Sequence, residues 1–386
     1  MKSNNTVDHE LNVTSLSVLQ TDVAQSDTSN EYTRSEKRTC VIFVSSVIIL
    51  IAIIIIIILT IIAKETPIIK KSVTTTTTRT TEVLFNVTMT VTEDYPSWNQ
   101  YGISISIGMI LRSVKGITVD DDDHETIYFA DSSANCIVRR RSNVAKGEVI
   151  AGGNGRGNKS NQLHAPTHTV IDKAKNSIII CDSGNRRVVR WSLQNSSDQQ
   201  IIASNVTCTD IAIDRDGAIY ISDHEQCVVT RWKEGESRGK VVAGGNGKGR
   251  GLDQLHYPTY LAVDQDYSVY VSDSNNNRVM KWLKNAKEGI VVAGGRGSGA
   301  HMKELNGPKG IFVDQRSNVY VVDSLNHRVM RWSDRSRDIW IVVGGYGDGR
   351  ASHQLFAPED ISIDRQGNLY VIDDGNRRIQ KFEFEP

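Results

Sequence analysis

The sequence predicts an all-β propeller of six blades that follows a single membrane-spanning helix. A motif recurs six times at a period of about fifty residues, which is typical of a repeat fold. One long apolar run, Val41–Ala63, contains no charged residue. A strand-like segment before the first repeat, Tyr101–Ile107, supplies the strand that the last repeat lacks. These three observations define the predicted architecture.

The apolar run predicts a transmembrane helix. As a helix, Val41–Ala63 would extend about 35 Å at roughly 1.5 Å per residue, enough to cross a hydrocarbon core of about 30 Å. Residues 1–40 precede it, and its apolar stretch exceeds the about 7–15 residues of a signal peptide core. We therefore interpret residues 41–63 as an uncleaved signal anchor and reject a buried soluble helix.

The segments on either side of this run favour a type II topology. Residues 1–40 are rich in Ser, Thr, Asn and Asp, which predicts a disordered cytoplasmic tail. Residues 64–97 form a predicted Thr-rich stalk or linker, as in O-glycosylated stalks. Basic residues flank both ends of the run, so the positive-inside rule is nearly balanced. With the stalk outside, the propeller is expected on the outer side of the plasma membrane.

Glycosylation sequons agree with this topology without deciding it. Four Asn-x-Ser/Thr sequons lie beyond the apolar run and are candidate glycosylation sites: Asn86, Asn158, Asn195 and Asn205. Asn4 and Asn12 begin sequons in the tail as well, so the sequons alone do not determine the orientation.

The repeat occupies residues 98–386. Ile311–Trp332 (IFVDQRSNVYVVDSLNHRVMRW) and Leu261–Trp282 (LAVDQDYSVYVSDSNNNRVMKW) match most closely. Each copy contains short β-branched or aromatic runs bounded by Asp, Asn, Gly or Ser, which is typical of strands. Four strands per repeat at this period predict a propeller blade. An Asp marks the same place in each copy: Asp131, Asp182, Asp223, Asp273, Asp323 and Asp373.

The two ends of the repeat region predict how the ring closes. The sixth copy stops after its third strand-like run, near Phe382–Glu385, whereas Tyr101–Ile107 precedes the first copy without a partner. Placing Tyr101–Ile107 as the outer strand of the last blade completes six blades of four strands. This arrangement leaves no open seam where strand edges would promote aggregation.

The recurring order, hydrophobic-x-Val-Asp followed by Tyr-Val-x-Asp-Ser-x-Asn-x-Arg-Val-x-Lys/Arg-Trp, resembles the NHL repeat over residues 98–386. Copy one departs at Cys136 and Arg140, and copy three at Cys227 and Val228. The resemblance implies a six-bladed propeller. It also implies a wide range of functions: binding platforms for protein or RNA, extracellular sensors, and a lyase that cleaves peptidyl-hydroxyglycine. A fold of this kind therefore does not name the function.

The repeated polar residues predict structure rather than chemistry. Because Asp323, Asn326 and Arg328 have counterparts at one register, we expect the Asp to accept backbone N–H groups and the Arg to brace a loop. Gly152–Gly157 and Gly244–Gly249 predict turns with positive φ, since no helix follows as a phosphate loop would require. Four tryptophans are expected to pack between blades: Trp191, Trp232, Trp282 and Trp332.

The candidate site comes from positions that differ between copies. The residue just before each first strand should ring the mouth of the central channel: Gly116, His168, Asp210, Tyr260, Gly310 and Asp360. We take four of these as candidate ligand-binding residues: His168, Asp210, Tyr260 and Asp360. His168 and the two aspartates can hold a cation or a basic group. The alternative is that Asp210 and Asp360 only accept nearby backbone amides.

Four cysteines lie in the repeat region. The preferred pair is Cys181–Cys208, which would brace the shortened second blade, and a Cys208–Cys227 pair is the alternative. Cys136 and Cys227 are left unassigned. A bridge would add about 2–4 kcal/mol of stability and would indicate an oxidising compartment.

These observations lead to three functional hypotheses. The first is a membrane-anchored extracellular module that presents one propeller face to a protein, peptide or glycan partner. The second is a metal-dependent lyase resembling the peptidyl-hydroxyglycine lyase. Zinc needs at least three ligands and His168 is the one mouth histidine, so we predict no enzyme activity, catalytic residue, metal site or cofactor. The third is a cytosol-facing scaffold or RNA binder. With 45 basic and 45 acidic residues, the chain has no net charge, and nucleic acid is not expected as a partner.

Overall fold

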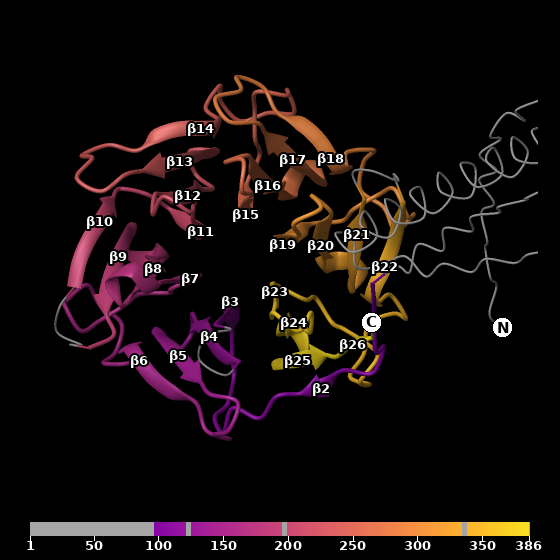
Figure 1. Cartoon of the computed structure of the whole chain (residues 1–386), viewed down its shortest axis with the longest axis horizontal. Helices are drawn as coiled ribbons and strands as arrows, with labels where there is room; N and C mark the ends of the chain where they lie inside the picture. Colours follow the sequence, from indigo (N-terminus) through magenta and orange to yellow (C-terminus); the bar gives the residue numbers. More distant parts are fainter. Residues whose placement is uncertain (1–95, 121–124, 195–198, 334–337, 386) are drawn as a thin grey trace, which may run out of the picture. The chain divides into compact units, whose positions relative to one another are not determined.

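Six four-stranded antiparallel sheets form the blades of a ring (Figure 1). The structure is a computed structural model that describes residues 96–120, 125–194, 199–333 and 338–385. The predicted all-β six-bladed propeller is confirmed, and the helices within these ranges are single 3-10 turns. No helix in the described ranges is long and apolar enough to cross a bilayer. The predicted tail, the apolar run 41–63, residues 64–95 of the stalk and Asn86 lie outside them.

The first three blades take their strands in chain order. Blade 1 contains β3 (Val114–Asp120), β4 (Thr126–Asp131), β5 (Cys136–Arg140) and β6 (Glu148–Gly152). Blade 2 contains β7 (Thr169–Asp172), η1 (Lys173–Lys175), β8 (Ser177–Asp182), η2 (Ser183–Asn185), β9 (Arg187–Ser192) and β10 (Gln199–Ser204). Blade 3 contains β11 (Cys208–Ile213), β12 (Ile219–Asp223), β13 (Val228–Trp232) and β14 (Lys240–Gly244). The first strand of each blade is nearest the centre of the ring.

The last three blades repeat this order. Blade 4 contains β15 (Pro258–Val263), β16 (Val269–Asp273), η3 (Ser274–Asn276), β17 (Arg278–Trp282) and β18 (Ile290–Gly294). Blade 5 contains β19 (Pro308–Val313), β20 (Val319–Asp323), η4 (Ser324–Asn326), β21 (Arg328–Trp332) and β22 (Ile339–Gly344). Blade 6 contains β23 (Ile361–Ile363), β24 (Leu369–Asp373), η5 (Asp374–Asn376) and β25 (Arg378–Phe382), with β2 (Ile103–Ser104) as its outer strand.

The hydrophobic core lies between neighbouring blades. Six clusters of buried side chains each join two adjacent blades. As predicted, the repeated tryptophan packs against the preceding blade; Trp282 of blade 4, for example, joins Tyr220 and Val229 of blade 3. Because a blade has apolar side chains on both faces, it is stable only when both neighbours cover it.

The N-terminal segment closes the ring as predicted. β2 pairs antiparallel with β25, so blade 6 is completed by residues that precede blade 1. The strand is shorter than the predicted Tyr101–Ile107, although Ile105 N still donates to Ile379 O at 2.9 Å. Gly102 makes the close approach possible, since a Cβ there would lie 2.8 Å from the Phe382 ring. A second pairing, of β1 (Ser97–Trp98) with β26 (Phe384–Glu385), was not predicted.

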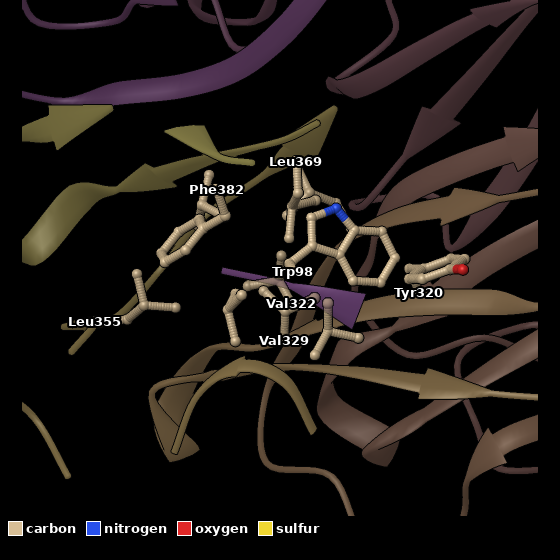
Figure 2. Close-up of a cluster of buried hydrophobic side chains, with 11 residues drawn as sticks. Trp98, Tyr320, Val322, Val329, Leu355, Leu369 and Phe382 are labelled. Atoms are coloured by element: carbon tan, nitrogen blue, oxygen red, sulfur yellow. The ribbon is translucent and has the colours of Figure 1, made fainter. Parts of the chain in front are cut away.

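Trp98 fills the core between blades 5 and 6 (Figure 2). Its ring meets Tyr320 edge-on at 5.8 Å between ring centroids and Phe384 at 5.6 Å. Its indole N–H donates to Gly367 O at 2.7 Å. Trp98 therefore links the N-terminal segment to two blades through apolar contact and one hydrogen bond.

The repeated Asp–Asn–Arg set is a loop clamp, as predicted. In blade 5, Asp323 accepts from Arg328 Nε at 2.7 Å and from Asn326 Nδ2 at 2.8 Å. The other oxygen of Asp323 accepts the backbone N–H of Asn306. The Arg328 guanidinium also donates to carbonyls of the preceding Gly-rich loop. The same Asp–Arg contact recurs in blades 2, 4 and 6 and holds each loop on the following blade.

We expect Trp98→Ala to lower the free energy of unfolding by about 3–5 kcal/mol, because it leaves a cavity at the ring closure and an unpaired Gly367 carbonyl. Denaturant titration of the full chain, followed by circular dichroism, measures this change. Tyr101→Ala is the matched control. Its side chain is 66% exposed on the same segment, so its effect should stay within about 0.5 kcal/mol. Equal effects of the two variants would contradict the role given to Trp98.

Candidate functional site

The six variable residues surround the channel mouth on one face of the ring. The chain enters the inner strand of every blade, which is its first strand, from the same side of the ring. We call this side the top face and the opposite side the bottom face. His168 and Asp360 directly precede β7 and β23, as expected. The other four lie inside β3, β11, β15 and β19, not before them. These four strands begin earlier than predicted. Each contains a bulge, and strand pairing continues beyond the bulge to a residue that precedes the variable one.

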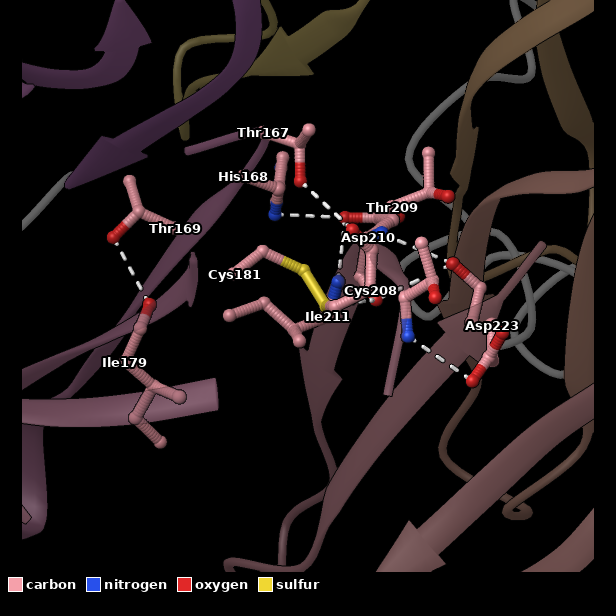
Figure 3. The surroundings of a disulfide bond; sticks show 12 residues. Thr167, His168, Thr169, Ile179, Cys181, Cys208, Thr209, Asp210, Ile211 and Asp223 are labelled. Carbon is pink, nitrogen blue, oxygen red and sulfur yellow. Dashed lines mark hydrogen bonds and ion pairs between the residues drawn. A yellow bond between two sulfur atoms is a disulfide. The ribbon is translucent and has the colours of Figure 1, made fainter. Parts of the chain in front are cut away.

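His168 connects the two aspartates across the channel. Its Nδ1 lies 2.7 Å from Asp210 Oδ1 of blade 3, and its Nε2 lies 3.5 Å from Asp360 Oδ2 of blade 6. Figure 3 shows the His168 ring directed at Asp210. The Nδ1 contact is an ion pair without a well-aligned hydrogen bond. The His168 ring therefore lies between the two aspartates, where we had predicted a bound cation or basic group.

The surrounding charges keep His168 protonated. Burial by itself would lower the pKa of His168, but the negative charge of Asp210 and the contacts with Asp210 and Asp360 raise that pKa to about 10. Burial also raises the pKa of Asp360 to about 6, against the opposing effect of His168. His168 is therefore a buried imidazolium held between two aspartate side chains.

A second charged group lies beside this trio. The Tyr260 hydroxyl donates to Lys115 O of blade 1 at 2.6 Å, across the channel from its own blade 4. Burial, with the nearby Glu359 carboxylate, raises the pKa of Tyr260 well above its ordinary value. Glu359 Oε2 forms ion pairs with Lys309 Nζ at 2.6 Å and with Lys115 Nζ at 3.2 Å. None of the predicted site residues was Lys115, Lys309 or Glu359, although each of these three is adjacent in sequence to a variable mouth position.

The two glycines among the six mouth positions make room for the His168 and Asp360 side chains. A Cβ at Gly116 would lie 2.1 Å from His168 Cδ2, and a Cβ at Gly310 would lie 2.4 Å from Asp360 Oδ1. The four predicted ligand-binding side chains are all buried. They therefore close the channel mouth and offer little surface to a ligand in this conformation.

Both aspartates also bind backbone amides, as the alternative interpretation required. Asp210 Oδ2 accepts Leu261 N of blade 4 at 2.7 Å, and Asp360 Oδ2 accepts Ile117 N of blade 1 at 2.9 Å. Each carboxylate therefore ties its blade to the next inner strand. These bonds give the mouth residues a structural task that is independent of any ligand.

Cys181 and Cys208 are joined in the structure as a disulfide, with their Cα atoms 5.6 Å apart (Figure 3). The bond links the second strand of blade 2 to the inner strand of blade 3, next to the His168–Asp210 contact. Thr167 Oγ1 reinforces the same boundary by donating to Cys208 O. Cys136 and Cys227 are free and buried, and burial raises the pKa of the Cys136 thiol to about 11.

The top-face loops carry exposed apolar side chains. Among them are Tyr257, Leu325 and Phe356, on the loops of blades 4, 5 and 6. Tyr257 stacks against His224 at 4.9 Å between ring centroids, and Phe356 packs on His327 at 5.6 Å. The sequence signal for Tyr257 was available: it occupies the pre-proline position that holds Ala165, Gly307 and Ala357 in other copies.

Metal ligation and glycosylation were also part of the sequence analysis. Within the ranges described, no group of three or more His, Cys, Asp or Glu residues is arranged to hold a metal ion. Both nitrogens of the protonated His168 face carboxylates, so neither is free to bind a metal. Asn158 and Asn205 are exposed, whereas Asn86 and Asn195 lie outside the described residues.

Comparison with known proteins identifies the fold alone. No protein-family model and no curated protein match the sequence. Among solved structures, an auxiliary nutrient binding protein from Bacteroides ovatus has a TM-score of 0.58 at 12% identity, over 75% of this chain and 73% of that one. Its counterpart from Bacteroides thetaiotaomicron has a TM-score of 0.57 at 13% identity, with the same coverage. A gluconolactonase from Xanthomonas campestris has a TM-score of 0.55 at 12% identity, over 76% of this chain and 95% of that one. Binding proteins and an enzyme thus share this architecture.

We expect the stability of the propeller to fall as the pH rises from 6.5 toward 10. The folded-state pKa of His168, about 10, lies above its ordinary value of 6.5. Its contribution is therefore complete below pH 6.5 and is lost as the pH rises toward 10. Denaturant titrations across this range should show a smaller pH dependence for His168→Gln than for the natural chain. His301→Gln, an exposed histidine, should keep the natural slope; an unchanged slope in His168→Gln would refute the assignment.

We expect the Cys181→Ala/Cys208→Ala double variant to lose about 2–4 kcal/mol of unfolding free energy, because the bond restrains 27 residues of the unfolded chain. Cys136→Ala serves as control, since it removes a buried thiol that forms no disulfide. Intact mass after alkylation provides a second measurement. Cys181 and Cys208 should become reactive only in denaturant with reductant, and labelling without reductant would contradict the bond.

Proposed function

We propose that this chain is a membrane-anchored binding module that displays the top face of its propeller outside the cell. The observation that carries the proposal is the separation of two features. The top-face loops of blades 4, 5 and 6 carry the exposed apolar side chains Tyr257, Leu325 and Phe356, whereas the residues of the channel mouth are buried. Exposed apolar side chains on loops provide contact surface for a partner. The closed channel mouth directs a partner to these loops instead of the axis.

The place where the N-terminal segment joins the propeller supports this arrangement. Trp98 binds Gly367 O in the turn between β23 and β24, which is on the bottom face. Ser97 and Trp98 therefore lie at the bottom of the propeller, on the side opposite the top-face loops that we propose bind a protein, peptide or glycan.

Three features support a location outside the cell. The Cys181–Cys208 bond is of a kind that persists in oxidising compartments. Asn158 and Asn205 are accessible for glycosylation. The Thr-rich segment of residues 64–97 has the composition of a stalk. We also propose that the blades are NHL repeats, on the basis of their six-fold Asp motif and the loop clamp in four blades.

The lyase alternative is not favoured by any arrangement of the described residues. His168 lies between the carboxylates of Asp210 and Asp360, and both carboxylates accept backbone amides, so all three candidate ligands already have partners within the protein. A binding function needs no such ligand set, because the exposed loops provide the contact surface.

We expect glycosidase treatment of the full-length protein, expressed in a eukaryotic cell, to increase its electrophoretic mobility. The increase should disappear when all four candidate sequons are removed. Asn86, Asn158 and Asn195 can be changed to Gln, whereas Asn205 has φ +59° and is better changed to Asp, which tolerates this backbone conformation. An Asn4→Gln/Asn12→Gln variant is the control for the tail and should keep the shift. A shift that depends on the tail sequons, or no shift, would refute the proposed orientation.

A further inference from the structure

We infer that the top face holds a site for a neutral glycan at the boundary of blades 3 and 4, built on Tyr257 and His224. This inference rests on the proposed binding function and names the chemical class of one ligand. It starts from the backbone of Tyr257, which has φ +60°. In the equivalent loops the residue with positive φ is small: Ala165, Gly307 and Ala357.

The left-handed conformation is unfavourable for a residue that has a side chain. The Tyr257 ring is not held by burial, because 45% of the residue remains exposed. Tyr257 therefore presents an exposed aromatic ring at a position where the equivalent loops present small side chains, and this ring is available to a partner.

His224 completes a platform with Tyr257. The two rings lie 4.9 Å apart with 52° between their planes. Thr209 Oγ1 lies 2.9 Å from His224 Nδ1 and orients the imidazole. Nε2 of His224 has no partner among the residues described, and is available to a ligand hydroxyl.

Neutral polar groups border the platform. His256, next to Tyr257 in the chain, contacts the exposed Asn275 through Nε2 and Nδ2, 3.2 Å apart. His224 has an acidic neighbour on each side in sequence. Asp223 is buried and accepts backbone N–H groups, and Glu225 forms an ion pair with Arg186 at 2.6 Å. The exposed groups beside the two rings are therefore amide, imidazole and hydroxyl groups and one ion pair.

This combination matches the surface of a pyranose ring. A pyranose has an apolar C–H face that packs on an aromatic ring, and hydroxyl groups at its edge that exchange hydrogen bonds with amides and imidazoles. An anionic sugar would need a basic rim, and an extended peptide would need a groove or a free strand edge. The platform is one ring wide and neutral, so a neutral oligosaccharide is the ligand that it fits.

Binding of the full-length protein to immobilised neutral oligosaccharides of glucose, mannose and galactose tests the inference, with sialylated and sulfated glycans on the same surface. The detergent must lack a sugar headgroup, which would compete. We expect binding to at least one neutral glycan and a loss of about tenfold or more in Tyr257→Ala. Tyr257→Phe should keep most of the affinity. Tyr257→Ala should fold normally, since Ala165 and Ala357 already take this conformation.

Tyr101→Ala is the matched control, because it removes an exposed tyrosine ring from the closing segment, outside the top-face loops, and should leave glycan binding unchanged. Absence of neutral-glycan binding, binding of acidic glycans only, or unchanged affinity in Tyr257→Ala would overturn the glycan site. A protein or peptide ligand that is lost in Leu325→Ala and Phe356→Ala would keep the binding module and refute the glycan. A failed glycosidase shift would refute the location without affecting this measurement.

Discussion

Pairing of the N-terminal segment with the last blade is the constraint on which this propeller depends. Every blade has two apolar faces, and the ring is stable only if all six boundaries are covered. Without β2 and Trp98, β25 would become an open strand edge and the core between blades 5 and 6 would be incomplete. The two segments that pair are separated by almost the whole propeller sequence, so bringing them together costs chain entropy. Packing and backbone hydrogen bonds must offset this cost.

The closed ring in turn brings together the charges at its centre. His168, Asp210 and Asp360 come from blades 2, 3 and 6, and their contact requires that the inner strands surround a narrow axis. The low-dielectric surroundings make these charges expensive to bury unless they pair and accept hydrogen bonds, as they do here. The axis is therefore filled by structural contacts, and the proposed binding surface lies instead on the top-face loops, where Tyr257, Leu325 and Phe356 are exposed.

Much of the fold could be predicted because the repeat appears six times. Agreement between copies identified the strands, the closing segment, the Asp–Asn–Arg clamp and the tryptophans between blades. Departures from the repeat were harder to interpret. The variable mouth residues were recognised, but the bulges that move Asp210 and Tyr260 inside their strands were not, since a bulge depends on hydrogen bonding across a strand pair. The sequence shows a large residue at Tyr257 where other copies have Ala or Gly, but the exposure and the positive φ of Tyr257 exist only in the folded chain.

The amino-acid sequence by itself determined the all-β class, the number of blades, the strand order and the loop chemistry, because these follow from local patterns repeated at a fixed period. Only the tertiary structure decided which side chains meet across the axis: His168 as the cation between two aspartates, Tyr260 reaching Lys115, and the lysines converging on Glu359. Those contacts join residues of different blades, and their distances depend on the curvature and closure of the ring. No pattern within one repeat contains that information.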